Sequence, residues 1–393
     1  MIPLLRVTRS RWLFLLACVL SAGLCPSTVY ADGGAPQLAY VAGSAQGISV
    51  IDIAQRRLIA TFPVAGNPHA VLLSQDGHAL YVTQPAIDRV VVLAAQTGKA
   101  LCSASLPGQP SLLALSLDTT VLYAAGQGDT SVRVLDPTTC AIQHIFETHE
   151  PVYGLAVTAS TASNATPTTP NQIWVVGRTG LTIFDATGQL LGSVAIPGGP
   201  QYISIPGGLT AYVTTHQGTV VAVDLNTQQI MRTLLNGGQF GPMDYDATTG
   251  EVYVPDLRHN QMDVLTPVTA STAILPREPV RVLQLSGSPQ AIAITNDGQF
   301  GFAALANGQV LMLDIPARRI VASLAVGGTP QFIITGLYPP TNTPVATPQQ
   351  TQSSLLQPDG VLFLLALVLV AALVLAACWF LWRRSRKRGG HIS

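Results

Sequence analysis

A unit of just over 40 residues recurs seven times along this chain. Each unit contains an apolar, alternating strand led by an aromatic residue, at Tyr40, Tyr81, Tyr123, Trp174, Tyr212, Tyr253 and Phe302. A proline precedes the first strand of successive units, at Pro68, Pro110, Pro151, Pro200, Pro242, Pro289 and Pro330. Aspartates end the third strand of five units, at Asp52, Asp136, Asp185, Asp224 and Asp314. We interpret these aspartates, and the Asp-Gly pairs at Asp76 and Asp297, as turn formers that cap backbone N–H groups.

A repeat of this length with four short strands is typical of a β-propeller blade. The units are rich in Val, Ile, Thr and Tyr and alternate with period two, which favours strands over helices. The fold class predicted is therefore all-β, a seven-bladed β-propeller. The first unit begins at Leu38, in a second strand, and a surplus first strand covers 329–335. We expect this last strand to complete blade one and remove an exposed edge, so that a chain ending at Gly328 leaves the ring open.

The ends of the chain predict export and membrane anchoring. Residues 1–31 combine three arginines, a short apolar run and small residues near Ala31, as in a cleaved signal peptide. The propeller is expected over 32–338 and a Pro/Thr/Gln-rich stalk over 339–358. Residues 359–382 include the uncharged run Val361–Trp382, long enough for one transmembrane helix, and 383–393 form a basic tail expected to be cytoplasmic. The alternatives are an uncleaved N-terminal anchor, a lipoprotein at Cys25 and a cell-wall sorting signal.

The charges are segregated along the chain. Lys and Arg together number 20, as do Asp and Glu, but three basic residues lie in 1–31 and five in 383–393. All the acidic residues lie between Asp32 and Asp359, so the exported part has 12 basic and 20 acidic residues, a net charge of about −8. Nucleic-acid binding normally requires a basic face. We therefore expect no nucleic-acid partner.

Two of the five cysteines, Cys102 and Cys140, lie within the predicted propeller. An even pair in an oxidising compartment is compatible with a disulfide. Both are expected near the outer strands of neighbouring blades but at offset positions, and a disulfide requires Cα atoms within about 7 Å. The offset favours two separate buried thiols, with the disulfide as the alternative.

Leu80-Tyr81-Val82-Thr83, preceded by Ser74-Gln75-Asp76-Gly77, and the matching Tyr212-Val213-Thr214 resemble the YVTN-type repeats of YncE-like β-propellers. The resemblance covers Leu38 to Tyr338 and implies a secreted or surface protein of a bacterium or archaeon. Families with related blades include lactonases and the propeller parts of haem- or quinone-dependent oxidoreductases. The resemblance supplies blade-building residues and no catalytic motif.

In a propeller, the starts of the first strands and the loops between second and third strands share one face, around the central channel. The residues that follow the blade prolines are expected to line this channel mouth: His69, Ser111, Val152, Gln201, Met243, Gln290 and Gln331. The same-face loops add Arg178, His216, Arg258 and His259. These side chains suit a small ligand or a peptide, but they also suit a solvated funnel that satisfies backbone groups, which is the simpler interpretation.

The sequence contains no CxxCH, GxSxG or P-loop motif, and the histidines lack the spacing of a zinc site. We expect no metal and no cofactor. The predicted function is a monomeric, membrane-tethered extracellular module that binds a protein, peptide or glycan without catalysis. The alternative is an enzyme, either a lactonase-like hydrolase or a haem/quinone oxidoreductase-related domain, which would need several ionisable groups converging at the mouth. A purely structural spacer is a third alternative.

Overall fold

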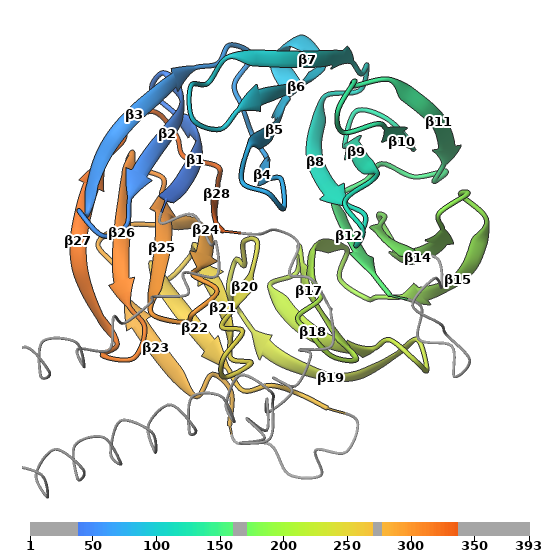
Figure 1. Cartoon of the computed structure of the whole chain (residues 1–393). Helices are drawn as coiled ribbons and strands as arrows, with labels where there is room; N and C mark the ends of the chain where they lie inside the picture. The colour runs from blue at the N-terminus through green and yellow to red at the C-terminus, as the bar shows by residue number, and fades with distance from the viewer. Residues whose placement is uncertain (1–37, 160–170, 270–276, 337–393) are drawn as a thin grey trace, which may run out of the picture. The chain divides into compact units, whose positions relative to one another are not determined.

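The computed structural model describes residues 38–159, 171–269 and 277–336, and these form seven four-stranded antiparallel sheets arranged as a ring (Figure 1). The predicted seven-bladed β-propeller is confirmed. The segments predicted as a signal peptide (1–31), a stalk (339–358), a transmembrane helix (359–382) and a basic tail (383–393) lie outside the described residues. Within the described ranges, no helix has the length and apolar character needed to cross a membrane.

Each blade runs from an inner strand at the channel to an outer strand at the rim. The inner strands of blades one to seven are β28 (Phe332–Thr335), β4 (Val71–Leu73), β8 (Pro110–Leu115), β12 (Gly154–Thr158), β16 (Pro200–Ser204), β20 (Asp244–Tyr245) and β24 (Pro289–Ile294). The second strands are β1 (Leu38–Ser44), β5 (Ala79–Gln84), β9 (Leu122–Gly126), β13 (Gln172–Val176), β17 (Thr210–Thr215), β21 (Val252–Asp256) and β25 (Phe300–Leu305).

The outer half of each blade completes the sheet. The third strands are β2 (Gly47–Asp52), β6 (Arg89–Ala94), β10 (Ser131–Leu135), β14 (Gly180–Asp185), β18 (Thr219–Asp224), β22 (Gln261–Leu265) and β26 (Gln309–Asp314). The outer strands are β3 (Arg57–Pro63), β7 (Ala100–Ser105), β11 (Ile142–Glu147), β15 (Leu190–Ala195), β19 (Gln229–Asn236), β23 (Arg281–Gln284) and β27 (Arg319–Ala325). A short 3-10 helix, η1 (Pro85–Ile87), links β5 to β6.

The hydrophobic core lies between neighbouring blades. The second and third strands have apolar side chains on both faces, because each blade is covered by a blade on either side. Trp174 of β13 is fully buried and packs in one cluster with Val213 and Val221 of the next blade. All seven aromatic markers are at most 6% exposed, so they are core residues rather than ligand platforms.

The ring is closed by strands from the two ends of the described chain. β28 pairs with β1 in antiparallel register, from Ala39 opposite Thr335 to Ala42 opposite Phe332. Ile333 and Ile334 of β28 are almost fully buried, in the clusters toward blades seven and two respectively. The predicted closure of blade one is confirmed.

The repeated aspartates act as turn formers, as predicted. The carboxylate of Asp136 accepts hydrogen bonds from the N–H groups of Thr138 and Thr139, both at 2.8 Å. Asp76 accepts from the hydroxyl of Ser74 at 2.6 Å and from the N–H of His78 at 3.0 Å. These carboxylates stabilise the turns between strands by accepting hydrogen bonds within them, so we assign them a structural role.

Cys102 and Cys140 form a disulfide, with an S–S distance of 2.06 Å and a Cα–Cα distance of 5.8 Å. The favoured expectation of two separate thiols is wrong. Cys102 lies on β7 of blade two, and Cys140 lies in the turn before β11 of blade three. Cys140 lies outside β11, in a left-handed backbone conformation with φ 61°, so the strand register does not set its distance from Cys102. The disulfide joins the rims of two neighbouring blades.

Candidate functional site

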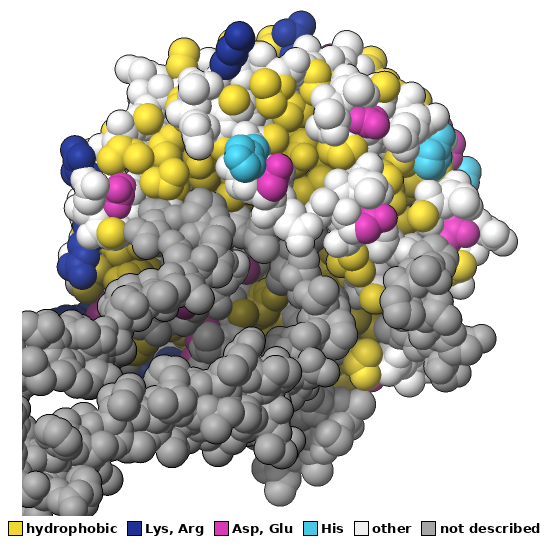
Figure 2. Space-filling model, viewed as in Figure 1, with side chains coloured by type: hydrophobic (Ala, Val, Ile, Leu, Met, Phe, Trp, Pro, Cys, Tyr) yellow, Lys and Arg dark blue, Asp and Glu magenta, His cyan; other side chains and the backbone are white. Residues whose placement is uncertain are grey.

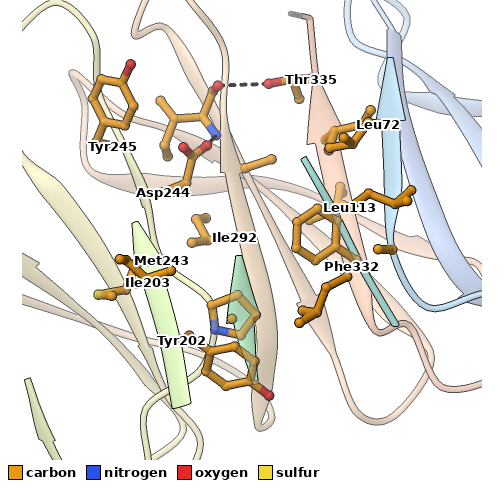
Figure 3. A pocket seen from close by; sticks show the side chains of 18 of the residues that line it. Leu72, Leu113, Tyr202, Ile203, Met243, Asp244, Tyr245, Ile292, Phe332 and Thr335 are labelled. Carbon is orange, nitrogen blue, oxygen red and sulfur yellow. Dashed lines mark hydrogen bonds between the residues drawn. The ribbon is translucent and has the colours of Figure 1, made fainter. Parts of the chain in front are cut away.

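A cavity of about 230 Å³ occupies the central channel. All seven inner strands contribute to its wall, so no single blade forms it. Figure 3 shows part of this wall. His69 and Ser111 lie at the end of the channel where the inner strands begin. Ala247 and Asn296 lie just beyond the opposite ends of β20 and β24. Concave sites where several elements converge are the usual position of ligand pockets.

The wall of the cavity is mainly apolar and aromatic. Leu72, Leu113, Ile203, Met243 and Ile292 supply aliphatic and thioether surface. Tyr202 of blade five and Phe332 of blade one add two aromatic rings, which Figure 3 shows around the same cavity. Burial raises the pKa of Tyr202, against a smaller opposing effect of a hydrogen bond with Gln201. Its phenol is therefore neutral at physiological pH.

Asp244 of β20 lines this apolar wall. Its Oδ2 accepts a hydrogen bond from the N–H of Ile294, on the neighbouring inner strand β24, at 2.7 Å. Burial raises the pKa of Asp244 to about 7, although hydrogen bonds from the N–H groups of Ile294 and Tyr245 oppose the shift. A carboxyl group in an apolar cavity retains its proton to a higher pH because the charged form loses solvation. Asp244 therefore changes charge near neutral pH.

The backbone N–H and the carbonyl oxygen of Ile294 each hydrogen-bond a side chain from a neighbouring blade. Asp244 accepts from its N–H, and the hydroxyl of Thr335 donates to its carbonyl oxygen at 2.8 Å (Figure 3). Thr335 lies on β28, so three inner strands from blades six, seven and one meet here. The bond from the Ile294 N–H fixes the Asp244 carboxylate against the neighbouring blade.

His69 marks the other end of the cavity. Its Nδ1 lies 3.0 Å from the carbonyl oxygen of Ser111, on the next inner strand. Burial lowers the pKa of His69, and the contact with Ser111 opposes this only in part. With Nδ1–H donating to Ser111, the imidazole is neutral at pH 7 and its Nε2 is an acceptor.

Two of the nine ligand-binding residues predicted from the sequence, His69 and Ser111, line the cavity. Met243, expected at the mouth, also lines it, but Gln201, Gln290 and Gln331 are half-buried and do not. Gln201 hydrogen-bonds the hydroxyl of Tyr202, and the amide of Gln290 lies 3.4 Å from the hydroxyl of Ser288. At least these two glutamines satisfy neighbouring polar groups.

The predicted residues from the second-to-third-strand loops are exposed on the same end of the ring and do not line the cavity. Glu150 accepts from the backbone N–H of Arg178 at 2.6 Å. The ring of His216 packs edge-on against Tyr153, with centroids 5.7 Å apart. Arg258 donates to the carbonyl oxygen of Gly237 at 3.1 Å, and His259 Nδ1 lies 2.5 Å from Asp256 Oδ2. Among the described residues, no three His, Cys, Asp or Glu side chains are placed to hold a metal ion together.

The sequence reasoning missed Asp244 because it counted from the blade prolines. Asp244 pairs with the aromatic marker Tyr253, nine residues later. In the other blades this inner-strand position holds Ile334, Leu72, Ala114, Ala156, Ser204 and Ala293. In blade six the proline comes two residues before the position opposite the aromatic marker, whereas in blades two, three and seven it comes four residues before it. A count from the prolines therefore misses Asp244. An alignment of the seven units on their aromatic markers would have identified Asp244 as the one charged residue at this inner-strand position.

The visible face carries its basic side chains near the rim. In Figure 2, Lys and Arg side chains stand at the edge of the ring, and apolar side chains cover much of the face. The residues that line the cavity include His69 and Asp244 but no Lys or Arg. The site therefore offers an acceptor for a cation or a hydrogen-bond donor and no fixed positive charge.

No protein-family model and no curated protein matches the chain significantly. Solved structures do match. A structure described as functionally unknown from Desulfotomaculum acetoxidans shares 13% identity and a TM-score of 0.62, covering 77% of this chain and 99% of that one. Hydrazine synthase of Kuenenia stuttgartiensis shares 14% identity and a TM-score of 0.59, with 70% and 91% covered. The dihydro-heme d1 dehydrogenase NirN shares 15% identity and a TM-score of 0.56, with 76% and 75% covered. At these identities the likeness establishes the β-propeller fold alone.

Proposed function

We propose that the chain is a membrane-tethered, exported β-propeller of the YncE-like, YVTN-repeat type that binds an extracellular protein, peptide or glycan without catalysis. The observation that carries the proposal is the central cavity, which has a wall of aliphatic and aromatic side chains from seven strands. Such a wall supplies shape and buried apolar area, which binding requires. A catalytic site needs several ionisable groups at mutual hydrogen-bonding distance, whereas Asp244 and His69 hydrogen-bond backbone groups of neighbouring strands.

The loops around the channel mouth give a larger partner a rim to contact. Arg178, His216 and Arg258 are exposed there, on loops of three successive blades. The short links between strands keep these loops on a rigid scaffold, a common arrangement for binding residues. The partner would approach along the channel axis and place one group in the cavity.

The test is capture of a partner from a detergent extract of the cell envelope by the immobilised full-length protein. A variant with Arg178→Ala, His216→Ala and Arg258→Ala should lose the partner that the wild type captures. The matched control carries Gln75→Ala, His78→Ala and Gln299→Ala, three exposed positions at the opposite end of the ring. Equal capture by all three proteins, or no capture by any, would count against binding at the mouth.

Membrane tethering is proposed from the uncharged run Val361–Trp382 and the basic cluster that follows it. Alkaline carbonate extraction of membranes should leave the protein in the pellet. Protease added outside intact cells or spheroplasts should remove the propeller epitope and spare an epitope at Ser393. Release of the whole protein into the supernatant would contradict the anchor.

One observation favours the enzyme alternative. Asp244 has its pKa raised to about 7 in a cavity, a property of general acids and bases. A lactone hydrolysis or redox activity abolished by Asp244→Asn, in a protein that still unfolds cooperatively, would establish the enzyme in place of the binding module.

A further inference from the structure

Asp244 is a carboxylate with acceptor capacity left in an apolar cavity. A carboxylate offers about four acceptor positions, and the N–H groups of Ile294 and Tyr245 account for two of them. Leu72, Ile292 and Met243 line the same cavity. An ionised carboxylate in such surroundings is costly unless an opposite charge or further donors reach it.

The rest of the wall favours a cation as that partner. Besides Asp244, the ionisable side chains that line the cavity are His69, Tyr202 and Tyr245. The lowered pKa of His69 and the raised pKa of Tyr202 leave both neutral at pH 7. A bound cation would therefore meet one negative group and no positive one. The excess of acidic residues in the exported part adds a favourable long-range field.

The aromatic rings supply the second half of a site for an organic cation. Tyr202 and Phe332 come from blades five and one and lie around the same space as Asp244 (Figure 3). Aromatic faces attract ammonium groups through the ring quadrupole and pack against the apolar carbon atoms that carry the charge. A cavity of about 230 Å³ is small beside typical ligand pockets, so it suits a single short chain or ring.

We propose that the channel binds a primary ammonium group on an apolar stem, with the ammonium at Asp244 and the stem against Tyr202, Phe332 and the aliphatic wall. The inference rests on the proposed function as a binding module and names the chemistry that the module recognises. A free arylalkylamine and the lysine side chain of a peptide share this chemistry.

The test is isothermal titration of the full-length protein in detergent with three probes of similar shape. Phenethylamine is cationic, 2-phenylethanol is neutral and 3-phenylpropanoate is anionic. At pH 8 the cation should bind at least ten-fold more tightly than the alcohol, and the anion should not bind. Binding of the cation should weaken at pH 5.5, where Asp244 is protonated. Equal binding of cation and alcohol, preference for the anion or no binding of any probe would overturn the proposal.

Asp244→Asn removes the charge and keeps an oxygen to accept the Ile294 N–H, so the fold should persist. This variant should lose at least ten-fold in affinity for phenethylamine and little for the alcohol. The matched control is Asp263→Asn, which replaces another buried aspartate with a raised pKa that does not line the cavity. Equal loss in the two variants would contradict a specific role for Asp244. The three probes on the wild type decide the proposal even if Asp244→Asn fails to fold.

Two further arms separate the sources of the ammonium group. Nα-acetyl-lysine amide and a pentapeptide with a central lysine should bind if a peptide supplies it, and acetylation of that lysine should abolish binding. Binding of phenethylamine alone would assign the site to a free amine. If no ammonium probe binds but partner capture still depends on the mouth loops, this inference is contradicted and the proposed function is still supported.

Discussion

Replacement of Asp263 by Asn is expected to stabilise the protein at neutral pH and to have little effect near pH 4. Asp263 of β22 is 3% exposed and lies on the same face of blade six as Asp256 of β21, which is 2% exposed. Burial raises the pKa of Asp263 to about 6, and the charge of Asp256 adds to the shift. A hydrogen bond from Gln261 Nε2 at 2.8 Å and the nearby His259 oppose it without cancelling it.

The magnitude follows from the linkage between proton binding and folding. The folded state holds the Asp263 proton more tightly than the unfolded chain, where the pKa is near 4. The stabilisation by this proton is therefore complete below about pH 4 and is lost as the pH rises through about 6. A difference of about two pKa units corresponds to at most roughly 3 kcal/mol. Asn cannot ionise and still accepts from Gln261, so the variant should gain about 2 to 3 kcal/mol at pH 7.5.

The assay is urea unfolding of wild type and variant at pH 4.5, 6 and 7.5, compared as the difference in the free energy of unfolding. The control is Asp246→Asn. Burial acts to raise the pKa of Asp246, but hydrogen bonds from Thr248 and Thr249 outweigh it and lower that pKa. This control should lose stability at pH 7.5 and approach the wild type as the pH falls below about 4. A pH-independent difference for Asp263→Asn, or a loss at pH 7.5, would refute the reasoning.

Three further outcomes test the scaffold. Cys102→Ser should lower the free energy of unfolding by about 2 to 4 kcal/mol, as expected for a disulfide with a sequence separation of 38 residues; added reductant should have the same effect on the wild type and none on the variant. Ile334→Ala, in the closing strand, should cost about 2 to 4 kcal/mol in urea unfolding, while Ile320→Ala, 45% exposed at the rim, should cost well under 1 kcal/mol. A chain ending at Gly328 leaves the β1 edge unpaired, so light scattering should show aggregation; a monomeric, cooperatively unfolding product would contradict closure by β28.

Much of the scaffold was predictable because propeller blades are defined by local pattern. The aromatic marker, the alternation of period two and the turn aspartates each act within about 40 residues of sequence, and each has the predicted role. Closure was also predictable, since a chain that begins in a second strand and ends in a surplus first strand has one way to pair both edges. The candidate site was predicted less well: His69 and Ser111 line the cavity, whereas the mouth glutamines do not.

The sequence by itself determined the blade count, the strand order within each blade, the interblade aromatic core and the closing strand, because these depend on residue type and spacing along one chain. The tertiary structure decided which side chains meet across blades. Cys102 and Cys140 form a disulfide because the turn before β11 brings Cys140 to a Cα–Cα distance of 5.8 Å from Cys102 of the neighbouring blade. Asp244 becomes a channel residue with a raised pKa because the inner strand β20 of blade six places it against Ile294 of blade seven, where its carboxyl group loses solvation. Distances between blades and the loss of solvation inside the ring exist only once the ring has closed.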